Sequence, residues 1–302
     1  MPMSPNKGVE RKRGNRLGIW FFRSAVMLFG LRGAYGLLYF VSLYYLVFDR
    51  AVVTATLAYV RRRFPDHGTL RRLADVYLLF VNQGKNLIDR YYVASGGGDI
   101  EQELLGYEKI RDFLAEGQKG LIFLTAHVGN WQLAMTALKD LGRTVHIMMR
   151  PEDNAAVKEA LNIDSNRESV KILYTDGALG GVVEALKAIG QGDVVSIMGD
   201  RAYGYASLEA PLLGGDVRFP YGAFSLAAAA RCPVAVLLCS KVGVKKYITD
   251  ISHVINAPSG PRGGRDAEIK ACVREFAGIL EEYAVHYPFQ WFVFRDMWQG
   301  ND

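Results

Sequence analysis

His127 is the residue whose neighbours in the sequence most clearly favour chemistry. It follows a short apolar run, residues 121–125, that is typical of a buried strand, and it precedes a glycine and an expected helix start. In an open α/β sheet, ligands bind at the carboxyl ends of the strands. A neutral imidazole with an ordinary pKa of about 6.5 is suited to take a proton from a hydroxyl group there. We therefore predict that His127 is a general base rather than a structural, hydrogen-bonded histidine.

The residues just after His127 provide a turn and the start of a helix. Gly129 permits a sharp turn, and Asn130 can cap the helix expected at residues 130–141. The backbone N–H groups of a first helical turn can polarise a carbonyl oxygen or bind an anion. We expect both residues to take part in substrate binding.

A carboxylate that can assist His127 is found further along the chain. Asp200 follows the expected strand 194–198, whose carboxyl end belongs to the same sheet edge as His127. An aspartate in that position can orient an imidazole and stabilise its charged form. We predict this role for Asp200, and a loop-capping or salt-bridged aspartate is the alternative.

Three arginines are further candidates for substrate binding. Arg150 follows another expected strand and can bind a phosphate or the carboxylate of a sugar acid, while Arg201 and Arg295 are weaker candidates. The sequence contains no Gly-Xaa-Ser-Xaa-Gly elbow, Walker loop or His-Glu-Xaa-Xaa-His site, which argues against a serine hydrolase, an NTPase and a zinc protease. The three cysteines lack metal-ligand spacing, so we expect neither a metal nor a cofactor.

The elements that must position these residues alternate along most of the chain. Helical spacing first predicts helices at 70–92 and 101–114. Beyond them, strands are expected at 121–125, 144–149, 170–173, 194–198 and 233–239, and helices at 130–141, 155–166, 178–189, 221–230 and near the C-terminus. This order predicts an α/β fold with a mostly parallel central sheet and helices on both faces.

The N-terminal part has a different composition. A basic cluster is followed by an aromatic and apolar stretch at residues 17–48. Its cleanest piece, residues 33–48, is slightly shorter than the roughly 20 residues that span a bilayer upright, and its tyrosines and flanking arginines are typical of interfacial anchoring. We predict a membrane-associated helical segment in residues 1–60, ahead of one domain in residues 61–302. The alternative is an aromatic helical hairpin packed on that domain.

The net charge indicates which classes of partner suit the chain, and the cysteine content indicates its redox compartment. The 302 residues include 36 Lys and Arg against 31 Asp and Glu, which gives a formal net charge of +5. A mild basic excess suits anionic partners such as lipid headgroups or an acidic carrier protein, and the chain has no nucleic-acid-binding pattern. The odd, sparse cysteine count fits a reducing compartment, so the cytoplasmic side is expected.

Several stretches, in order, resemble a known family. The run His127-Val-Gly-Asn-Trp-Gln-Leu133 resembles the histidine motif of the lysophospholipid acyltransferase superfamily, and most of all its branch of late acyltransferases of lipid A biosynthesis. Similar to that branch are also Met149-Arg-Pro151, the block from residue 194 to residue 222 and the closing run Tyr287-Pro-Phe-Gln-Trp-Phe-Val-Phe-Arg295.

The resemblance implies a reaction, partners and a location. In that family the histidine deprotonates an acceptor hydroxyl, which then attacks an acyl thioester carried by acyl carrier protein or coenzyme A. The implied acceptor is a lipid A precursor or a related glycolipid or lysolipid, used in lipopolysaccharide synthesis at the cytoplasmic face of the bacterial inner membrane. An alcohol needs a positioned base at neutral pH, so the chemistry suits His127.

Gln132 departs from the family motif, which has an acidic residue at this position. A glutamine carbonyl can accept the imidazole N–H but carries no charge, and in a serine-protease triad such an acid-to-amide change costs about 10⁴ in turnover. Three possibilities follow: another carboxylate such as Asp200 substitutes, the enzyme is slow, or the chain binds acyl groups with little catalysis. A different acceptor, such as a lysophospholipid, an amino-acid lipid or a lipid-linked metabolite, is the runner-up.

Overall fold

The computed structural model describes residues 16–97, 100–117, 119–149, 170–175, 181–202, 204–260 and 264–298. Its central sheet has the strand order β1-β9-β8-β2-β5-β3-β4, with β10 paired beside β8. The strands are β1 (Glu101–Leu105), β2 (Ile122–Thr125), β3 (Val145–Met149), β4 (Val170–Tyr174), β5 (Val194–Met198), β8 (Val234–Lys241), β9 (Lys246–Asp250) and β10 (Val254–Ile255). Strands β8, β2, β5, β3 and β4 are all parallel, whereas β9 and β10 run antiparallel to β8.

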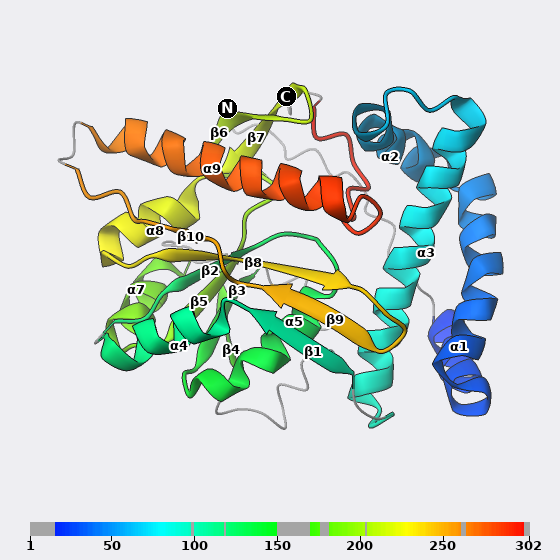
Figure 1. Ribbon diagram of the computed structural model, residues 1–302, viewed down its shortest axis with the longest axis horizontal. Helices are drawn as coiled ribbons and strands as arrows, with labels where there is room; N and C mark the ends of the chain where they lie inside the picture. Colours follow the sequence, from blue (N-terminus) through cyan, green and yellow to red (C-terminus); the bar gives the residue numbers. More distant parts are fainter. Residues whose placement is uncertain are drawn as a thin grey trace, which may run out of the picture.

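Helices cover both faces of this sheet (Figure 1), as the sequence predicted. They are α4 (Tyr107–Glu116), α5 (Trp131–Ala137), the short 3₁₀-helix η1 (Leu138–Leu141), α7 (Val182–Gly190), α8 (Gly222–Ala230) and α9 (Arg265–His286). Alternate residues of β2 enter two separate cores: Ile122 and Leu124 pack with α7, α8 and α9, whereas Phe123 packs with α4 and α5. A strand buried on both faces is apolar throughout, which explains the continuous apolar run in the sequence.

The expected helix at residues 101–114 was wrong in its first part. Residues Glu101–Leu105 form β1, which pairs in parallel with β9, and only Tyr107–Glu116 is helical. Gly106 separates the two elements with φ of +80°, and a Cβ at this position would lie 2.5 Å from the Cα of Ser252. In the sequence, residues 101–105 could not be distinguished from the first turns of the helix that follows them. Their pairing with β9 is what makes them a strand.

A hairpin on the α9 side was also not predicted. It consists of β6 (Ser207–Leu212) and β7 (Gly215–Pro220), whose inner residues Leu212, Val217 and Phe219 join the core that α9 covers. The other expected strands and helices with described residues are present, with ends that differ by a few residues. The expected helix at 155–166 lies outside the described residues.

Three N-terminal helices stand beside the sheet at the end towards which the arrow of β8 points (Figure 1). They are α1 (Arg16–Phe48), α2 (Arg50–Arg63) and α3 (Thr69–Ala94). One face of α1 packs on α3 through Val26, Tyr35 and Leu38, and Ile88 lies opposite them. Further along, Tyr59 of α2 and Leu79 of α3 belong to the same core as the sheet. The division into residues 1–60 and 61–302 stays a prediction.

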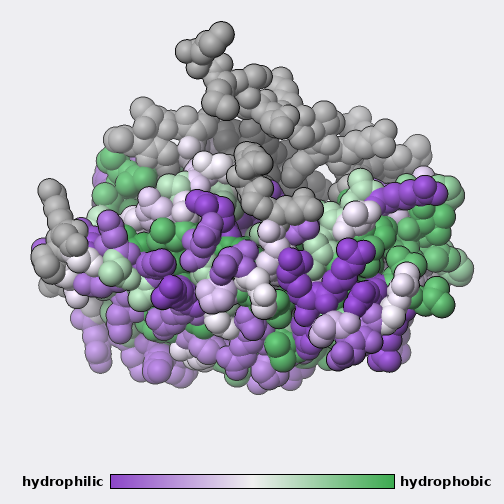
Figure 2. All heavy atoms as spheres, turned by 90° about the horizontal axis from the view of Figure 1, so that it is seen from above, coloured by the Kyte–Doolittle hydropathy of each residue, from purple (hydrophilic) through white to green (hydrophobic). Residues whose placement is uncertain are grey.

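The outward face of α1 is apolar and exposed. Met27 is 82% exposed, Phe40 74% and Phe48 69%, and Figure 2 shows hydrophobic atoms gathered at this end of the molecule. Residues Phe21–Phe48 are long and apolar enough to cross a membrane. The helix is broken at Gly30, where φ is +65°, and the part after the break rises about 27 Å, close to the hydrocarbon thickness of a bilayer. Both alternatives from the sequence are thus partly realised, because α1 packs on the domain and also exposes an apolar face that suits membrane anchoring. The basic cluster of the sequence, which precedes residue 17, lies almost entirely outside the described residues.

Candidate active site

His127 and Asp200 lie at the carboxyl ends of two neighbouring parallel strands. Thr125, the last residue of β2, is in register with Met198, the last residue of β5. His127 comes two residues after the end of β2, and Asp200 comes two residues after the end of β5. Because the strands run in parallel and end together, equal offsets bring the two side chains to the same place. The structure therefore joins the two residues that the sequence assigned to one sheet edge.

The two side chains form a close pair. His127 Nδ1 lies 2.7 Å from Asp200 Oδ1. A carboxylate can only accept hydrogen bonds, so Nδ1 must carry the proton and Nε2 of the neutral ring keeps its lone pair. Within the described residues Nε2 has no hydrogen-bond partner, and the imidazole is 28% exposed. A histidine in this arrangement can receive a proton from a molecule that approaches the sheet edge.

The Asp200 carboxylate is buried but well satisfied. Oδ2 accepts hydrogen bonds from the backbone N–H of His127 at 3.1 Å and from Trp291 Nε1 at 3.2 Å. Arg201 Nε lies 3.9 Å from the same oxygen. Burial alone raises the pKa of Asp200, but the charge and hydrogen bonds of His127 and the charge of Arg201 outweigh it and hold the pKa well below its ordinary value. Asp200 is thus ionised at neutral pH and can stabilise a positive charge on His127.

A C-terminal segment, residues 290–292, holds the loop that carries His127, and we call it the strap. The backbone N–H of Phe292 donates to the carbonyl of His127 at 2.9 Å, and the N–H of Gly129 donates to the carbonyl of Gln290 at 2.8 Å. Between them, Trp291 is fully buried and contacts Asp200 with its indole N–H. Sequence reasoning recognised this run as part of a family signature but assigned no role to Gln290 or Trp291. The only signal in the sequence that could have pointed to them is the family signature itself.

Gly129 and Asn130 shape the loop from the other side. Gly129 has φ of +47°, and a Cβ there would lie 1.8 Å from the carbonyl oxygen of Cys239, so no other residue fits. Asn130 caps α5 through a 3.3 Å bond from the N–H of Leu133 and donates from Nδ2 to the carbonyl of Asn86 at 3.3 Å. The expected turn and cap are confirmed. The contribution of these two residues to substrate binding stays a prediction.

Gln132 contacts an arginine of α3. Its Oε1 accepts a hydrogen bond from Arg90 Nη1 at 2.7 Å, and the side chain is buried. The Nδ1–H of the His127 imidazole donates its hydrogen bond to the Asp200 carboxylate instead. Of the two residues that the sequence offered as partners of His127, the structure brings only Asp200 into contact with the ring nitrogen. The catalytic role of Gln132 stays a prediction.

The arginine candidates have different surroundings. Arg201 is largely buried and donates from Nη2 to the carbonyl of Phe292 at 2.7 Å, so it joins the end of β5 to the strap. Arg295 lies three residues after Phe292 and is partly buried. Arg150 lies outside the described residues. Substrate binding by all three stays a prediction.

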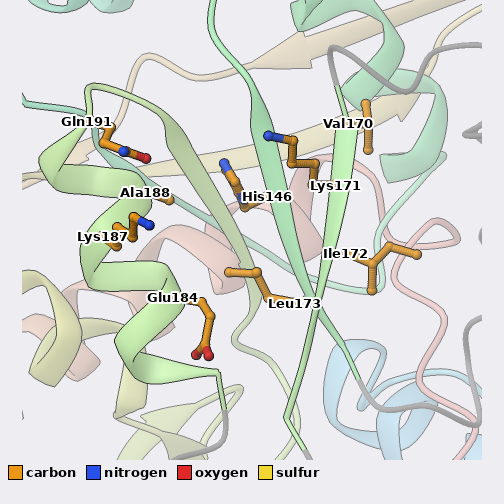
Figure 3. A pocket seen from close by; sticks show the side chains of 9 residues that line it. All are labelled: His146, Val170, Lys171, Ile172, Leu173, Glu184, Lys187, Ala188 and Gln191. Atoms are coloured by element: carbon orange, nitrogen blue, oxygen red, sulfur yellow. The ribbon is translucent and has the colours of Figure 1, made fainter.

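His146 lies at the opposite edge of the sheet. It is the second residue of β3, and its Nε2 lies 2.9 Å from Oδ2 of Asp193, which comes just before β5. Figure 3 shows it on the wall of a hollow between α7 and the strands β3 and β4, which Lys171 and Lys187 also line. The described residues contain no group of side chains able to hold a metal ion. This geometry is that of a structural, hydrogen-bonded histidine.

Comparison with known proteins identifies the family. A comparison with curated proteins gives no match. A model of the bacterial lipid A biosynthesis acyltransferases, in contrast, matches residues 98–300, a range that contains His127, Asp200 and the strap. The chain therefore belongs to the bacterial lipid A biosynthesis acyltransferase family, and it is an acyltransferase with an apolar N-terminal helix suited to membrane anchoring.

Proposed function

We propose that this chain transfers a fatty acyl group from a thioester of acyl carrier protein or coenzyme A to a hydroxyl of a lipid A precursor or related lipid. His127 acts as the general base, and Asp200 is its carboxylate partner. The observation that carries the proposal is the 2.7 Å contact between His127 Nδ1 and Asp200 Oδ1 at the carboxyl edge of the sheet. Membership of the acyltransferase family makes acyl transfer the reaction that this base serves.

The reaction begins with a proton transfer to His127. Nε2 takes the proton of the acceptor hydroxyl while the oxygen attacks the thioester carbonyl carbon, so a C–O bond forms and the carbonyl oxygen becomes negative. The tetrahedral intermediate then collapses, the C–S bond breaks, and the thiol leaves with the proton that Nε2 had received. The products are an ester and a free thiol, and His127 returns to its neutral form.

Asp200 supports this cycle in two ways. Its ionised carboxylate fixes the tautomer that leaves the lone pair on Nε2, and it stabilises the imidazolium that forms during the transfer. Because Asp200 is buried and accepts bonds from Trp291 and from the backbone of His127, it cannot swing away from the ring. The strap and the Gly129 turn hold the backbone of the same loop, which keeps the imidazole oriented.

The apolar outer face of α1 supports an interfacial site of action. A lipid acceptor stays in the bilayer, so an enzyme with a membrane helix beside its catalytic edge reaches the acceptor without extracting it. The basic N-terminal residues of the sequence would keep the N-terminus cytoplasmic if α1 inserts, by the positive-inside rule. We therefore propose that the site works at the cytoplasmic face of the inner membrane, where the thioester donors are found.

A different acceptor is the second candidate, and the observation that favours it is Gln132. Its neutral amide replaces the acid of the family motif and binds Arg90, so the charge beside α5 differs from that of a motif with a carboxylate. A different charge next to the catalytic loop suits a lipid with a different headgroup, and it does not require a different reaction. A lysophospholipid or an amino-acid lipid is the alternative acceptor class.

A reconstitution experiment tests the proposal. The full-length protein in liposomes receives an isotopically labelled acyl thioester, carried by acyl carrier protein or by coenzyme A, together with either a lipid A precursor or a lysophospholipid. Mass spectrometry of the extracted lipids should detect a labelled ester with one acceptor, and His127→Gln should abolish it. If neither acceptor is acylated and the thioester is not hydrolysed faster than without protein, the chain binds acyl groups without turnover and the proposal is wrong.

A further inference from the structure

A second buried carboxylate, Asp89 of α3, has no part in the reaction described above. It is fully buried. Its oxygens accept bonds from Lys241 Nζ at 2.5 Å, from the Tyr247 hydroxyl at 2.5 Å and from the Tyr35 hydroxyl. Lys241 ends β8, Tyr247 lies on β9 and Tyr35 lies on α1. One carboxylate therefore joins α1, α3 and two strands of the sheet, and we call these four residues the Asp89 cluster.

The chemistry of the Asp89 cluster makes it rigid. The Lys241 ammonium also donates to the carbonyl of Val244 at 2.8 Å and lies 4.7 Å from the ring centre of Tyr247. Burial lowers the pKa of Lys241 while the charge of Asp89 raises it, and burial together with Asp89 raises the pKa of Tyr247 well above its ordinary value. The tyrosine stays a donor at neutral pH. Moving any member would leave a buried charge or hydroxyl unsatisfied, which proteins avoid.

One route leads from the Asp89 cluster to His127 through the strap. The backbone N–H of Lys241 donates to Gln290 Oε1 at 2.7 Å, and Gln290 Nε2 donates back to the carbonyl of Lys241 at 2.9 Å. The carbonyl of the same Gln290 accepts the N–H of Gly129 at 2.8 Å. Gly129 is two residues from His127, so the position of Lys241 fixes the backbone of the catalytic loop.

A second route runs along α3. The Tyr247 hydroxyl oxygen also lies 2.8 Å from Oδ1 of Asn86, and the backbone carbonyl of Asn86 accepts a hydrogen bond from Nδ2 of Asn130, the cap of α5. One helical turn further, Arg90 binds Gln132 on α5. The face of α3 that receives Tyr35 from α1 is thus continuous with the residues that hold the start of α5.

We propose that the Asp89 cluster is a positioning device that couples the packing of α1 on α3 to the orientation of the His127 loop. Tyr35 is its contact on the candidate membrane helix, so the seating of α1 sets how well the imidazole is aligned with the acceptor. A displacement of about 1 Å at a reacting group costs up to about 10² in rate, so a remote contact of this kind affects turnover more than binding. The inference rests on the proposed function of His127. The variant His127→Gln tests that function, and the tyrosine variants test the inference.

The test compares two tyrosines that tie α1 to α3. Tyr35→Phe removes a hydroxyl from the Asp89 cluster, whereas Tyr77→Phe removes a hydroxyl that bonds the carbonyl of Tyr39 on α1 and touches no member of the Asp89 cluster. Both changes delete one oxygen between the same two helices. The readouts, on full-length protein in phosphatidylglycerol–phosphatidylcholine liposomes, are kcat and KM for hydrolysis of palmitoyl-CoA, and amide hydrogen exchange of residues 126–131.

The expected result separates positioning from stability. Tyr35→Phe should lower kcat about tenfold with KM unchanged and speed exchange in residues 126–131, whereas Tyr77→Phe should leave both within about twofold. Tyr247→Phe should behave like Tyr35→Phe and is preferred to Asp89→Asn, which strands the Lys241 charge and can unfold the protein. Wild-type kcat and exchange in both cluster variants, or equal losses in Tyr35→Phe and Tyr77→Phe, would overturn the inference. If His127→Gln keeps its hydrolysis rate, the proposed function fails instead.

Discussion

Two histidine–aspartate pairs lie at opposite edges of one sheet, and only one of them has the accessible imidazole that the proposed proton transfer needs. In the pair His127–Asp200 the carboxylate is 1% exposed and the imidazole 28% exposed. In the pair His146–Asp193 the order is reversed, with the imidazole 10% exposed and the carboxylate 22% exposed. The contacts are nearly equal in length, 2.7 Å and 2.9 Å.

The comparison shows that accessibility, not the contact itself, separates the two pairs. Nδ1 of His146 is buried without a hydrogen-bond partner among the described residues, so the ring has no open nitrogen to offer. The imidazole of His127, in contrast, is partly exposed and belongs to the carboxyl edge of the sheet, where ligands of α/β proteins bind. A buried carboxylate paired with an accessible imidazole suits a general base. A nearly buried imidazole paired with a more accessible carboxylate suits a structural link.

The largest expected effect is on the two histidines. His127→Gln should lower acyl transfer by about 10⁴ or more, because it removes the base itself, whereas His146→Gln should stay within about threefold of wild type. Initial rates of labelled ester formation give both values, and the circular dichroism spectrum verifies the fold. Comparable losses in the two variants would break the distinction drawn between the pairs.

The two aspartates should differ next. Asp200→Asn keeps the shape but removes the charge and the preference for one tautomer, so kcat should fall on the order of 10³ with KM little changed. Asp193→Asn is the matched control, and its kcat should remain near wild type. A normal kcat for Asp200→Asn on a verified substrate would remove the carboxylate from the mechanism.

Acid should weaken the protein partly through Asp200. Burial raises the pKa of this group, but His127 and Arg201 lower the pKa by more than burial raises it. The folded pKa is therefore below the unfolded value of about 3.9. The ionised form therefore contributes stability that is fully present above about pH 4 and is lost as the pH falls towards the folded pKa. Denaturant unfolding of wild type and Asp200→Asn in detergent, between pH 7 and pH 3, should show a stability gap that narrows only below about pH 4. A gap that is constant with pH would contradict the lowered pKa.

The smallest expected effect is on Gln132. Because its side chain binds Arg90 and the imidazole already has a carboxylate partner, Gln132→Glu should change kcat by less than about threefold. The added charge should pair with Arg90, which already binds this side chain, rather than with the imidazole. A rise in kcat above tenfold would mean that His127 lacks an effective acid, and it would point to Gln132 rather than Asp200 as the orienting residue.

The sheet edge that carries His127 and Asp200 was predictable because the sequence marks where each strand ends. A short apolar run marks a buried strand in the sequence, and a glycine with a polar residue follows within four positions: His127 and Gly129 after residues 121–125, Gly199 and Asp200 after residues 194–198. The parallel order of the strands then follows from the intervening helices. The prediction for residues 101–114 failed because a short edge strand has no continuous apolar run. Only the pairing with β9 identifies residues 101–105 as a strand.

The sequence by itself determined the α/β class, the apolar N-terminal helix and the histidine motif with its family. All of these depend on local order: periodicity, a run of apolar residues, or a fixed spacing of residue types. The tertiary structure alone decided that Asp200 rather than Gln132 contacts the imidazole, that residues 290–292 hold the loop of His127, and that Asp89 binds α1 to the sheet. These contacts join residues from 54 to 165 positions apart, from Tyr35 with Asp89 to His127 with Phe292. Hydrogen bonds between such distant residues leave no periodic trace in the chain, because they arise only when packing has brought the strand ends, α3 and the C-terminal segment together.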